Sequence, residues 1–463
     1  MFQKEVYVRR REALVKSMQA AGQKGLMIFM GNIAVPSQGT VEGNGYSFRQ
    51  DSTWIYFFGI DEPHWAATID IETGEAKVFA DDVDIDDIIW MGPQPSVASQ
   101  AAEVGVSKSA PYHDWEKEIA AAREKGRTIH FLPQLRYYNK MRVAEAAGRP
   151  LEEFSVSMTR AVAEIRLIKE ACEIEELDKV SDSGFRMHSA GRDAVRPGAR
   201  EMEICGLMAG IAHSEGWGLS FATILTQHGE TLHNHAHNGI VEPGKLMVID
   251  AGVESLTHYA SDHTRTYPTS GKFTTKQREI YQIVYDCNEY AFSLTKPGIS
   301  YRDVHIATVK KMLEGLKALG LVKGDVDEMS AKGIGGLFMP HGLGHNMGLD
   351  VHDMEDLGEN FVGYEEGQVR AKQLGLGNLR MARPLRAGHV ITDEPGIYFI
   401  PDLIAKFKKE GLGYDFVNYQ ALEGYYDFGG IRLEDDVLVT ADGARRLGTK
   451  RLPIAPDDIE SIL

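Results

Sequence analysis

Apolar and polar positions divide the first part of the chain into short elements. A helical spacing of apolar residues runs from about residue 5 to 21. Continuous apolar runs of strand length follow at 26–30, 54–58, 66–71 and 77–80, and Thr73-Gly74 is typical of a turn between the last two. The pattern therefore predicts a mixed α/β region.

From about residue 160 the pattern changes to longer elements. One long helix is predicted from a series of apolar positions, namely Ile165, Ile168, Cys172, Leu177 and Val180. Further helices are predicted over 200–215, over 301–319, and after Thr274, which forms a capping box with Gln277. Strand-like runs lie at 221–225, 246–252 and 262–267. Because 463 residues exceed the usual size of one core, we expect two domains, 1–160 and 161–463.

Composition narrows the classes of partner. The chain has 50 Lys and Arg against 67 Asp and Glu, a net charge of −17, which argues against nucleic acid and anionic membranes as partners. Its three cysteines, Cys172, Cys205 and Cys287, are far apart, so neither a disulfide framework nor a thiolate zinc site is indicated. No segment approaches the roughly 20 apolar residues of a membrane span. We expect a cytoplasmic protein.

Five potential metal ligands stand in order through the second half: Asp250, Asp262, His345, Glu394 and Glu434. Each lies in a segment that is predicted to be a strand or the end of one. A carboxylate there is costly to bury unless a positive charge meets it. Four carboxylates and one imidazole suit two divalent cations, and the oxygen-rich set favours Mn²⁺.

Each part of this pattern also has a simpler interpretation. Asp250-Ala-Gly252 alone is more typical of a turn, and His341 with His345 alone fits a buried pair of histidines as well as a site. His233 lies among other histidines that fit a polar surface loop. The order of all the motifs, with His352-Asp353 and Glu394-Pro-Gly396 downstream, favours a metal-dependent hydrolase.

The ordered motifs resemble the proline-specific peptidases of the pita-bread metallopeptidase family, aminopeptidase P and prolidase. The N-terminal resemblance is carried by Phe48-Arg-Gln-Asp-Ser52, Tyr56-Phe-Phe-Gly59 and Glu62-Pro63. The C-terminal resemblance is carried by Met339-Pro-His-Gly-Leu-Gly-His345, Gly348-Leu-Asp-Val-His-Asp353, Glu394-Pro-Gly-Ile-Tyr398 and Gly430-Ile-Arg-Leu-Glu-Asp-Asp436. The resemblance implies an α+β fold. A smaller α/β N-terminal domain would come first in the chain, followed by a pita-bread catalytic domain around a curved antiparallel sheet.

The resemblance also implies roles for individual residues. Asp250, Asp262, His345, Glu394 and Glu434 would hold two metal ions, usually manganese, with a bridging hydroxide as the nucleophile. Glu394 would also move a proton, and three histidines, His233, His341 and His352, would contact the substrate or support the site. Peptides with proline at the second position are the implied substrates.

Two features depart from the family pattern. His263 stands where the family has an apolar residue, and strand alternation predicts that it points away from the metals. Asp250 and Asp262 are one residue further apart than is usual, so we expect an extra turn residue or a bulge between them.

Three further residues bear on substrate choice. Arg380, in Leu379-Arg-Met-Ala-Arg383, matches the prolidase arginine that meets a dipeptide's carboxylate, although it also fits a loop cap. Arg432 is expected on the strand face of Glu434. Trp90 matches a tryptophan that reaches the neighbouring subunit's site, which implies a homodimer or larger homo-oligomer. An Xaa-Pro aminopeptidase and a strict Xaa-Pro dipeptidase therefore stay open as functions.

More distant alternatives are a non-catalytic peptide-binding pita-bread module and metal-free creatinase-like chemistry. Both are disfavoured because all five ligand positions are intact. A methionine aminopeptidase would lack the N-terminal domain.

Overall fold

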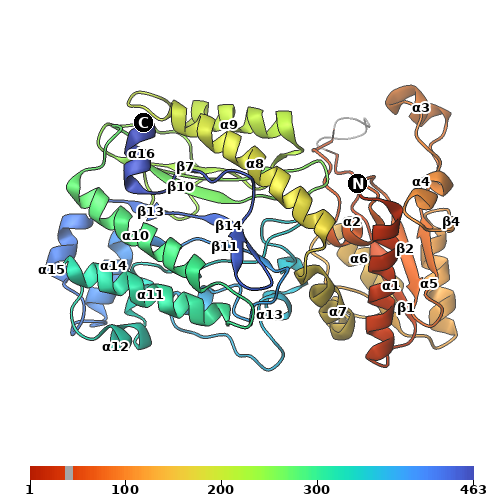
Figure 1. The fold of residues 1–463 in the computed structure, drawn as a ribbon. Coiled ribbons are helices and arrows are strands. Elements are labelled where there is room, and N and C mark those ends of the chain that lie inside the picture. The colour runs from red at the N-terminus through yellow and green to blue at the C-terminus, as the bar shows by residue number, and fades with distance from the viewer. Residues whose placement is uncertain (37–44) are drawn as a thin grey trace. The chain divides into compact units, whose positions relative to one another are not determined.

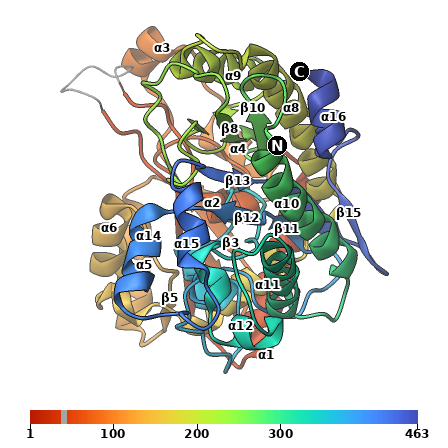
Figure 2. The same cartoon turned by 90° about the vertical axis from the view of Figure 1, so that its left-hand side faces the viewer.

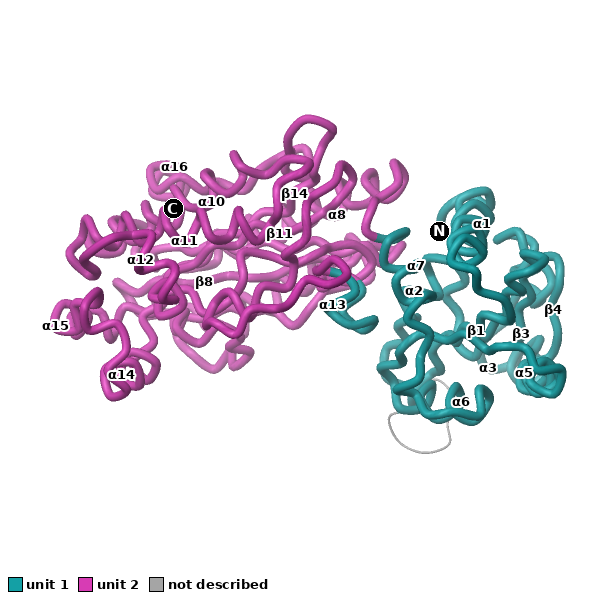
Figure 3. The backbone as a smooth tube through the Cα atoms, turned by 90° about the horizontal axis from the view of Figure 1, so that it is seen from below, with its two compact units in different colours: residues 1–166, 354–362 teal, residues 167–353, 363–463 magenta. Residues whose placement is uncertain are grey.

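The structure is a computed structural model that describes residues 1–36 and 45–463 (Figure 1). The chain forms two compact units, each assembled from two stretches of sequence (Figure 3). Unit 1 comprises Met1–Arg166 and Met354–Val362, and unit 2 comprises Leu167–Asp353 and Gly363–Leu463. Within the described residues, no helix combines the length and the apolar character needed to cross a membrane.

Unit 1 is built on a five-stranded mixed sheet in the order β4-β3-β2-β1-β5. Its strands are β1 (Leu26–Met30), β2 (Ala66–Asp70), β3 (Ala76–Phe79), β4 (Lys108–Ala110) and β5 (Ile129–His130). β2 is antiparallel to β1 and β3, whereas β3 with β4 and β1 with β5 are parallel pairs. The predicted α/β character of this region is confirmed.

The helices of unit 1 are α1 (Lys4–Ala20), α2 (Ser52–Phe58), α3 (Ile85–Met91), α4 (Val97–Glu103), α5 (Asp114–Glu124), α6 (Tyr137–Ala147), α7 (Val156–Leu167) and α13 (Glu359–Val362). The prediction of a strand at 54–58 is wrong, because these residues belong to α2. Asp51 caps this helix by accepting the Trp54 N–H at 2.8 Å, and Gly59 ends it with a φ of 62°. All residues of α2 are buried, so no polar stripe revealed the helical period.

The helices of unit 2 are α8 (Ala171–Ala194), α9 (Glu201–Glu215), α10 (Thr275–Leu294), α11 (Tyr301–Ala318), α12 (Val326–Ala331), α14 (Pro401–Lys409), α15 (Tyr419–Leu422) and α16 (Pro456–Ile462). Figures 1 and 2 show α8 beside α9 and α10 beside α11. The predicted capping box at Thr274 and Gln277 is confirmed. The single long helix predicted from Ile165 to Val180 is instead the end of α7 followed by α8, because a capping box of Glu170 and Glu173 starts a new helix.

Unit 2 contains only antiparallel pairs among the described strands. The strands are β6 (Gly218–Leu219), β7 (Ile224–Thr226), β8 (Leu246–Ala251), β9 (Val253–Glu254), β10 (His263–Pro268), β11 (Val390–Asp393), β12 (Gly396–Tyr398), β13 (Gly430–Arg432), β14 (Asp435–Val439) and β15 (Ala444–Arg446). The larger sheets are β10-β8-β7 and β11-β14-β15. This segregation of helices and antiparallel strands confirms the α+β class.

Strand register brings distant segments together. Thr264 pairs with Asp250 across β10 and β8, and it also bridges to Glu434 beyond β13. Asn346 bridges to Ile391 of β11. The four segments around residues 250, 264, 346 and 434 therefore meet at one place in unit 2.

The segment between Asp250 and Asp262 contains a turn. Ala251 pairs with His263 and Glu254 bridges to Ala260, so the register is continuous and contains no bulge. The turn that follows Glu254 is closed by a hydrogen bond from the Ser255 N–H to the Tyr259 carbonyl, and His258 adopts a φ of 69°. The structure thus contains a turn and no bulge between the two aspartates, and the extra residue relative to the family stays a prediction.

Candidate metal centre and active site

The five predicted ligands stand at strand ends or in adjoining loops. Asp250 is near the end of β8, and Asp262 directly precedes β10. Glu394 directly follows β11, and Glu434 lies between β13 and β14. His345 lies in the loop that pairs with β11. All five line one cavity of about 580 Å³ in unit 2.

Asp262, His345 and Glu434 form the tightest group. Each offers one ligand atom within 4.8 Å of the other two, and all three residues are buried. His345 Nε2 is 3.4 Å from Asp262 Oδ2 and 3.8 Å from Glu394 Oε1. The opposite oxygen of Asp262, Oδ1, is buried and has no hydrogen-bond partner among the described residues.

The orientation of His345 leaves a lone pair for a metal. Its Nδ1 lies 3.1 Å from the Asn346 carbonyl, which can only accept, so Nδ1 carries the proton. Nε2 is then an acceptor that faces two carboxylates, an arrangement that a cation stabilises. The backbone supports this placement, since the His345 N–H donates to Thr392 Oγ1 at 3.1 Å. A Cβ on Gly344 would lie 2.0 Å from the Thr392 carbonyl oxygen, so only glycine permits this approach.

The carboxylates of the cavity repel one another. Burial, with the charge of Asp250 nearby, raises the pKa of Asp262 well above its usual range. Burial, with the charge of Asp262, does the same to the pKa of Glu434, and burial raises the pKa of Glu394 to about 7. Divalent cations would favour the charged forms of all these groups. The donor set, the lone pair of His345 and the unpartnered Asp262 oxygen therefore fit a metal site.

Asp250 has a different partner from the other ligands. Its Oδ2 accepts a hydrogen bond from Arg432 Nη2 at 2.6 Å. Arg432 also donates to Thr264 Oγ1 at 3.3 Å, and the same hydroxyl donates to Glu434 Oε2 at 2.6 Å. The structure therefore places Arg432 against the site, where it compensates part of the negative charge.

A polar chain leads from Arg432 to His341. Arg432 Nη1 donates to the Tyr398 hydroxyl at 2.8 Å, and that hydroxyl lies 2.9 Å from His341 Nε2. His341 Nδ1 lies 2.7 Å from the Gly342 carbonyl, so Nδ1 is the donor and the Tyr398 hydroxyl donates to Nε2. Burial lowers the pKa of His341 to about 3, which keeps this imidazole neutral.

Three other predicted residues, His233, His352 and Arg380, line the same cavity. The ring of His352 is 4.1 Å from that of His345. Partial desolvation lowers the pKa of His233, although the residue is exposed. Trp90 belongs instead to α3 in unit 1, where its side chain is 78% exposed.

Residues outside the predicted set also shape the site. Thr264 contacts both Glu434 and Arg432, and Asp436 Oδ2 accepts the Asp262 N–H at 3.0 Å. The position of Tyr398 at the end of the Glu394-Pro-Gly-Ile-Tyr398 run, four residues after a candidate ligand, was the available signal for its role.

The departure at His263 does not disturb the site. Its Nε2 lies 3.3 Å from Ser181 Oγ of α8, so the ring faces the helix and not the ligands. The predicted orientation away from the metal centre is confirmed.

The fold and this cluster define the chain as a metal-dependent hydrolase, and comparison with known proteins narrows the class. Residues 173–441 match the model of metallopeptidase family M24, and residues 7–130 match the aminopeptidase P N-terminal domain. The chain is 32% identical to the Xaa-Pro dipeptidase of Homo sapiens, over 90% of this chain and 85% of that protein. It is 31% identical to a probable Xaa-Pro aminopeptidase of Paracoccidioides brasiliensis, over 90% and 87%.

A solved structure agrees with these relatives. Aminopeptidase P from Escherichia coli with the inhibitor Pro-Leu superposes with a TM-score of 0.79 at 28% identity, covering 100% of this chain and 98% of that one. The chain therefore belongs to metallopeptidase family M24, in its proline-specific branch with the pita-bread fold.

Proposed function

We propose that this enzyme is an Xaa-Pro aminopeptidase, which hydrolyses the bond between an N-terminal residue and proline. The observation that carries the proposal is the buried group of Asp262, His345 and Glu434 in a cavity large enough for a short peptide. Relatives named Xaa-Pro peptidases and a related structure with bound Pro-Leu support proline-containing peptides as substrates.

We propose two divalent ions, most readily Mn²⁺, as the cofactors. Asp250, Asp262, His345, Glu394 and Glu434 would hold them, and the oxygen-rich donor set supports manganese. When bound, such ions lower the pKa of water and polarise the scissile carbonyl. The Asp250 Oδ2 is held by Arg432, which keeps this carboxylate in place in the cavity.

The remaining residues position the peptide and move protons. Glu394, which lines the cavity directly after β11, would accept a proton from the attacking water and return it to the leaving proline nitrogen. Both ring nitrogens of neutral His341 are held, by the Gly342 carbonyl and the Tyr398 hydroxyl, so its ring can contact the substrate only through its carbon atoms unless one of these bonds breaks. His233 and His352 line the same cavity and are proposed to contact the substrate backbone.

A strict Xaa-Pro dipeptidase is the second candidate. One observation favours it: Arg380 lines the cavity, where its guanidinium can pair with the carboxylate of a dipeptide. A longer peptide has no carboxylate at that position.

Hydrolysis of an Xaa-Pro dipeptide and of an Xaa-Pro-Xaa tripeptide, both with Mn²⁺, separates the candidates. Tripeptide cleavage supports the aminopeptidase, and cleavage of the dipeptide alone supports the dipeptidase. Glu434→Ala is expected to abolish both. If neither peptide is cleaved with any divalent metal, the proposal fails and a non-catalytic binding module becomes the better interpretation.

Replacing Arg380 sharpens this test. Arg380→Met is expected to raise KM for the dipeptide about tenfold or more, since a charge-assisted contact is lost, and to leave the tripeptide nearly unchanged. Arg302→Met, on the exposed face of α11, is the matched control. Equal effects of both variants would exclude the carboxylate contact.

We also propose that the enzyme is a homo-oligomer in which α3 contacts a second copy. None of its residues is buried, and Ile85, Ile89, Trp90 and Met91 expose 68%, 67%, 78% and 57% of their surfaces. An apolar patch of this kind is typical of an interaction surface. Sedimentation velocity of Trp90→Ala should show weaker association, and unchanged association would reject this contact. No disulfide joins Cys172, Cys205 and Cys287 in the described part of the chain, which supports a reducing, cytoplasmic location.

A further inference from the structure

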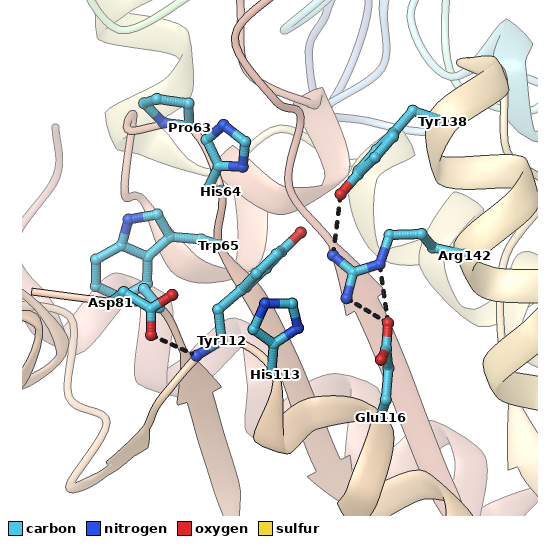
Figure 4. A pocket seen from close by; sticks show the side chains of 10 residues that line it. Pro63, His64, Trp65, Asp81, Tyr112, His113, Glu116, Tyr138 and Arg142 are labelled. Atoms are coloured by element: carbon cyan, nitrogen blue, oxygen red, sulfur yellow. Dashed lines mark hydrogen bonds and ion pairs between the residues drawn. The ribbon is translucent and has the colours of Figure 1, made fainter.

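Unit 1 contains a second cavity, of about 510 Å³, that the proposed peptidase chemistry does not use (Figure 4). It lies where β3 and the parallel strand β4 end, and it is bounded by the start of α5, by α6, and by the loop before β2. The carboxyl ends of parallel strands are common ligand sites in α/β domains. The residues that matter here are Trp65, Asp81, Tyr112, Glu116, Tyr138 and Arg142.

Tyr112 places a buried hydroxyl in this cavity. The side chain is 6% exposed, and its hydroxyl makes no hydrogen bond of good geometry within residues 1–36 and 45–463. The Tyr138 hydroxyl is the polar group that interacts with it most directly. The backbone is held in place because the Tyr112 N–H donates to Asp81 Oδ1 at 3.0 Å. Figure 4 shows the hydroxyl directed into the space between His64 and Arg142. A buried hydroxyl without a well-formed hydrogen bond costs free energy, and a ligand group that pairs with it removes that cost.

Arg142 supplies a fixed positive charge beside this hydroxyl. Its Nε and Nη2 donate to Glu116 Oε1 at 3.1 and 2.6 Å, and its Nη1 donates to the Tyr138 hydroxyl at 3.2 Å. The guanidinium carbon lies 4.5 Å from the centre of the Tyr112 ring. Only 11% of the Arg142 side chain is exposed, so the group is held rigidly.

Both signs of charge therefore line one cavity. Arg142 and the Tyr112 hydroxyl offer donors to an anionic group, whereas Asp81 and Glu116 offer acceptors to a cationic one. A purely anionic ligand would leave two carboxylates near its own charge. A purely cationic ligand would leave Arg142 and the Tyr112 donor unused. Trp65 and the Tyr112 ring add apolar surface, which suits a side chain of moderate size.

We propose that this cavity is a binding site for a small zwitterion, a free α-amino acid or a short peptide. The ligand carboxylate pairs with the Tyr112 hydroxyl and Arg142, and the ligand ammonium group pairs with Asp81 and Glu116. The ligand side chain lies against Trp65 and the Tyr112 ring. This site belongs entirely to unit 1 and does not depend on the proposed peptidase activity.

Titration calorimetry of the Mn²⁺-loaded full chain with free L-phenylalanine tests the proposal. Tyr112→Phe removes one oxygen and is expected to weaken binding about tenfold, and Arg142→Met is expected to weaken it further. Tyr137→Phe is the matched control, since Tyr137 is on the same helix as Arg142, is 76% exposed and does not line the cavity. Unchanged melting temperatures and peptidase rates of the variants show that the catalytic site is intact.

Blocked amino acids and a dipeptide distinguish the ligand chemistry. N-acetyl-L-phenylalanine and L-phenylalaninamide should both bind more weakly than the free amino acid, because each lacks one charge. Tighter binding of Phe-Phe than of phenylalanine identifies the short peptide as the ligand, and the reverse identifies the free amino acid. Equal binding of the blocked and free forms would overturn the zwitterion. Identical isotherms for the wild type, Tyr112→Phe and Arg142→Met would overturn the site itself.

Discussion

Glu434 and Asp435 are neighbours in the chain and belong to opposite electrostatic environments. Glu434 lines the metal cavity with three other carboxylates, and burial with the charge of Asp262 raises its pKa well above its usual range. Asp435 contacts three arginines, Arg265 at 2.5 Å, Arg446 at 2.8 Å and Arg451 at 2.7 Å. Burial opposes its charge, but these guanidinium groups outweigh burial and hold the pKa of Asp435 well below its usual range.

The carboxylates around Glu434 and the arginines around Asp435 differ in whether the protein itself balances their charge. Both carboxylates are almost completely buried, so burial alone does not identify a metal ligand. The protein supplies Asp435 with its own cations, and the metal cavity contains more negative than positive side chains. A buried excess of carboxylates that face one another indicates a cation from solution.

Removing the charge at Glu434 should have the largest effect. Glu434→Gln is expected to lower kcat/KM with Mn²⁺ about 1,000-fold, because a ligand to the metal is lost. In the presence of a chelator the same variant should unfold at higher urea concentration than the wild type, since one repelling charge is gone. Glu423→Gln, half exposed on the surface, is the control. A chelated variant less stable than the chelated wild type would contradict the contrast.

Asp435→Asn should destabilise the fold and leave the chemistry intact. Loss of this charge leaves the buried Arg265 without its counter-ion, which costs about 3 kcal/mol of unfolding free energy. Equilibrium urea unfolding measures the change, with Asp178→Asn, whose partner Arg445 is 39% exposed, as the matched control. A loss no greater than that of the control would show that the arginine cluster is not a structural ion pair.

His305 is a buried group that, unlike Glu434 and Asp435, can avoid carrying a charge in the folded protein. Burial lowers the pKa of His305 to about 4, because the charged imidazolium loses its hydration there. The unfolded chain takes up a proton near pH 6.5 and the folded one does not, so the contribution of neutral His305 is complete above that pH and is lost as the pH falls. Relative to His305→Met, the wild type should lose about 1 kcal/mol between pH 7.5 and 5.5. A pH-independent difference would contradict this burial.

The smallest effect is expected at an exposed ion pair. A hydrogen bond from Arg186 lowers the pKa of Glu215, but the Arg186 side chain is 53% exposed. Arg186→Met should therefore cost at most about 0.5 kcal/mol, and the loss should vanish below pH 4 and in high salt. Thermal unfolding at two ionic strengths measures it. A loss comparable with that of Asp435→Asn would remove the distinction between buried and exposed pairs.

Much of the fold could be predicted because its signals are local. The strand at 26–30, the α10 capping box and the boundaries of α11 follow from periodicity and capping within a few residues. The helix at 52–58 was missed because every residue is buried, which removes the polar face that marks a helical period. Asp51 and Gly59, which cap that helix at its two ends, are the residues in the sequence that indicate it.

The identity and order of the candidate ligands, the turn before Asp262 and the outward orientation of His263 were determined by the sequence alone. These depend on residue type and on the alternation of side chains along a strand. Only the tertiary structure decided that Arg432 pairs with Asp250, that His345 presents Nε2, and that the Tyr112 hydroxyl makes no well-formed hydrogen bond among the described residues. The reason is physical: pairing and desolvation depend on segments far apart in the chain, and no local pattern specifies how they meet.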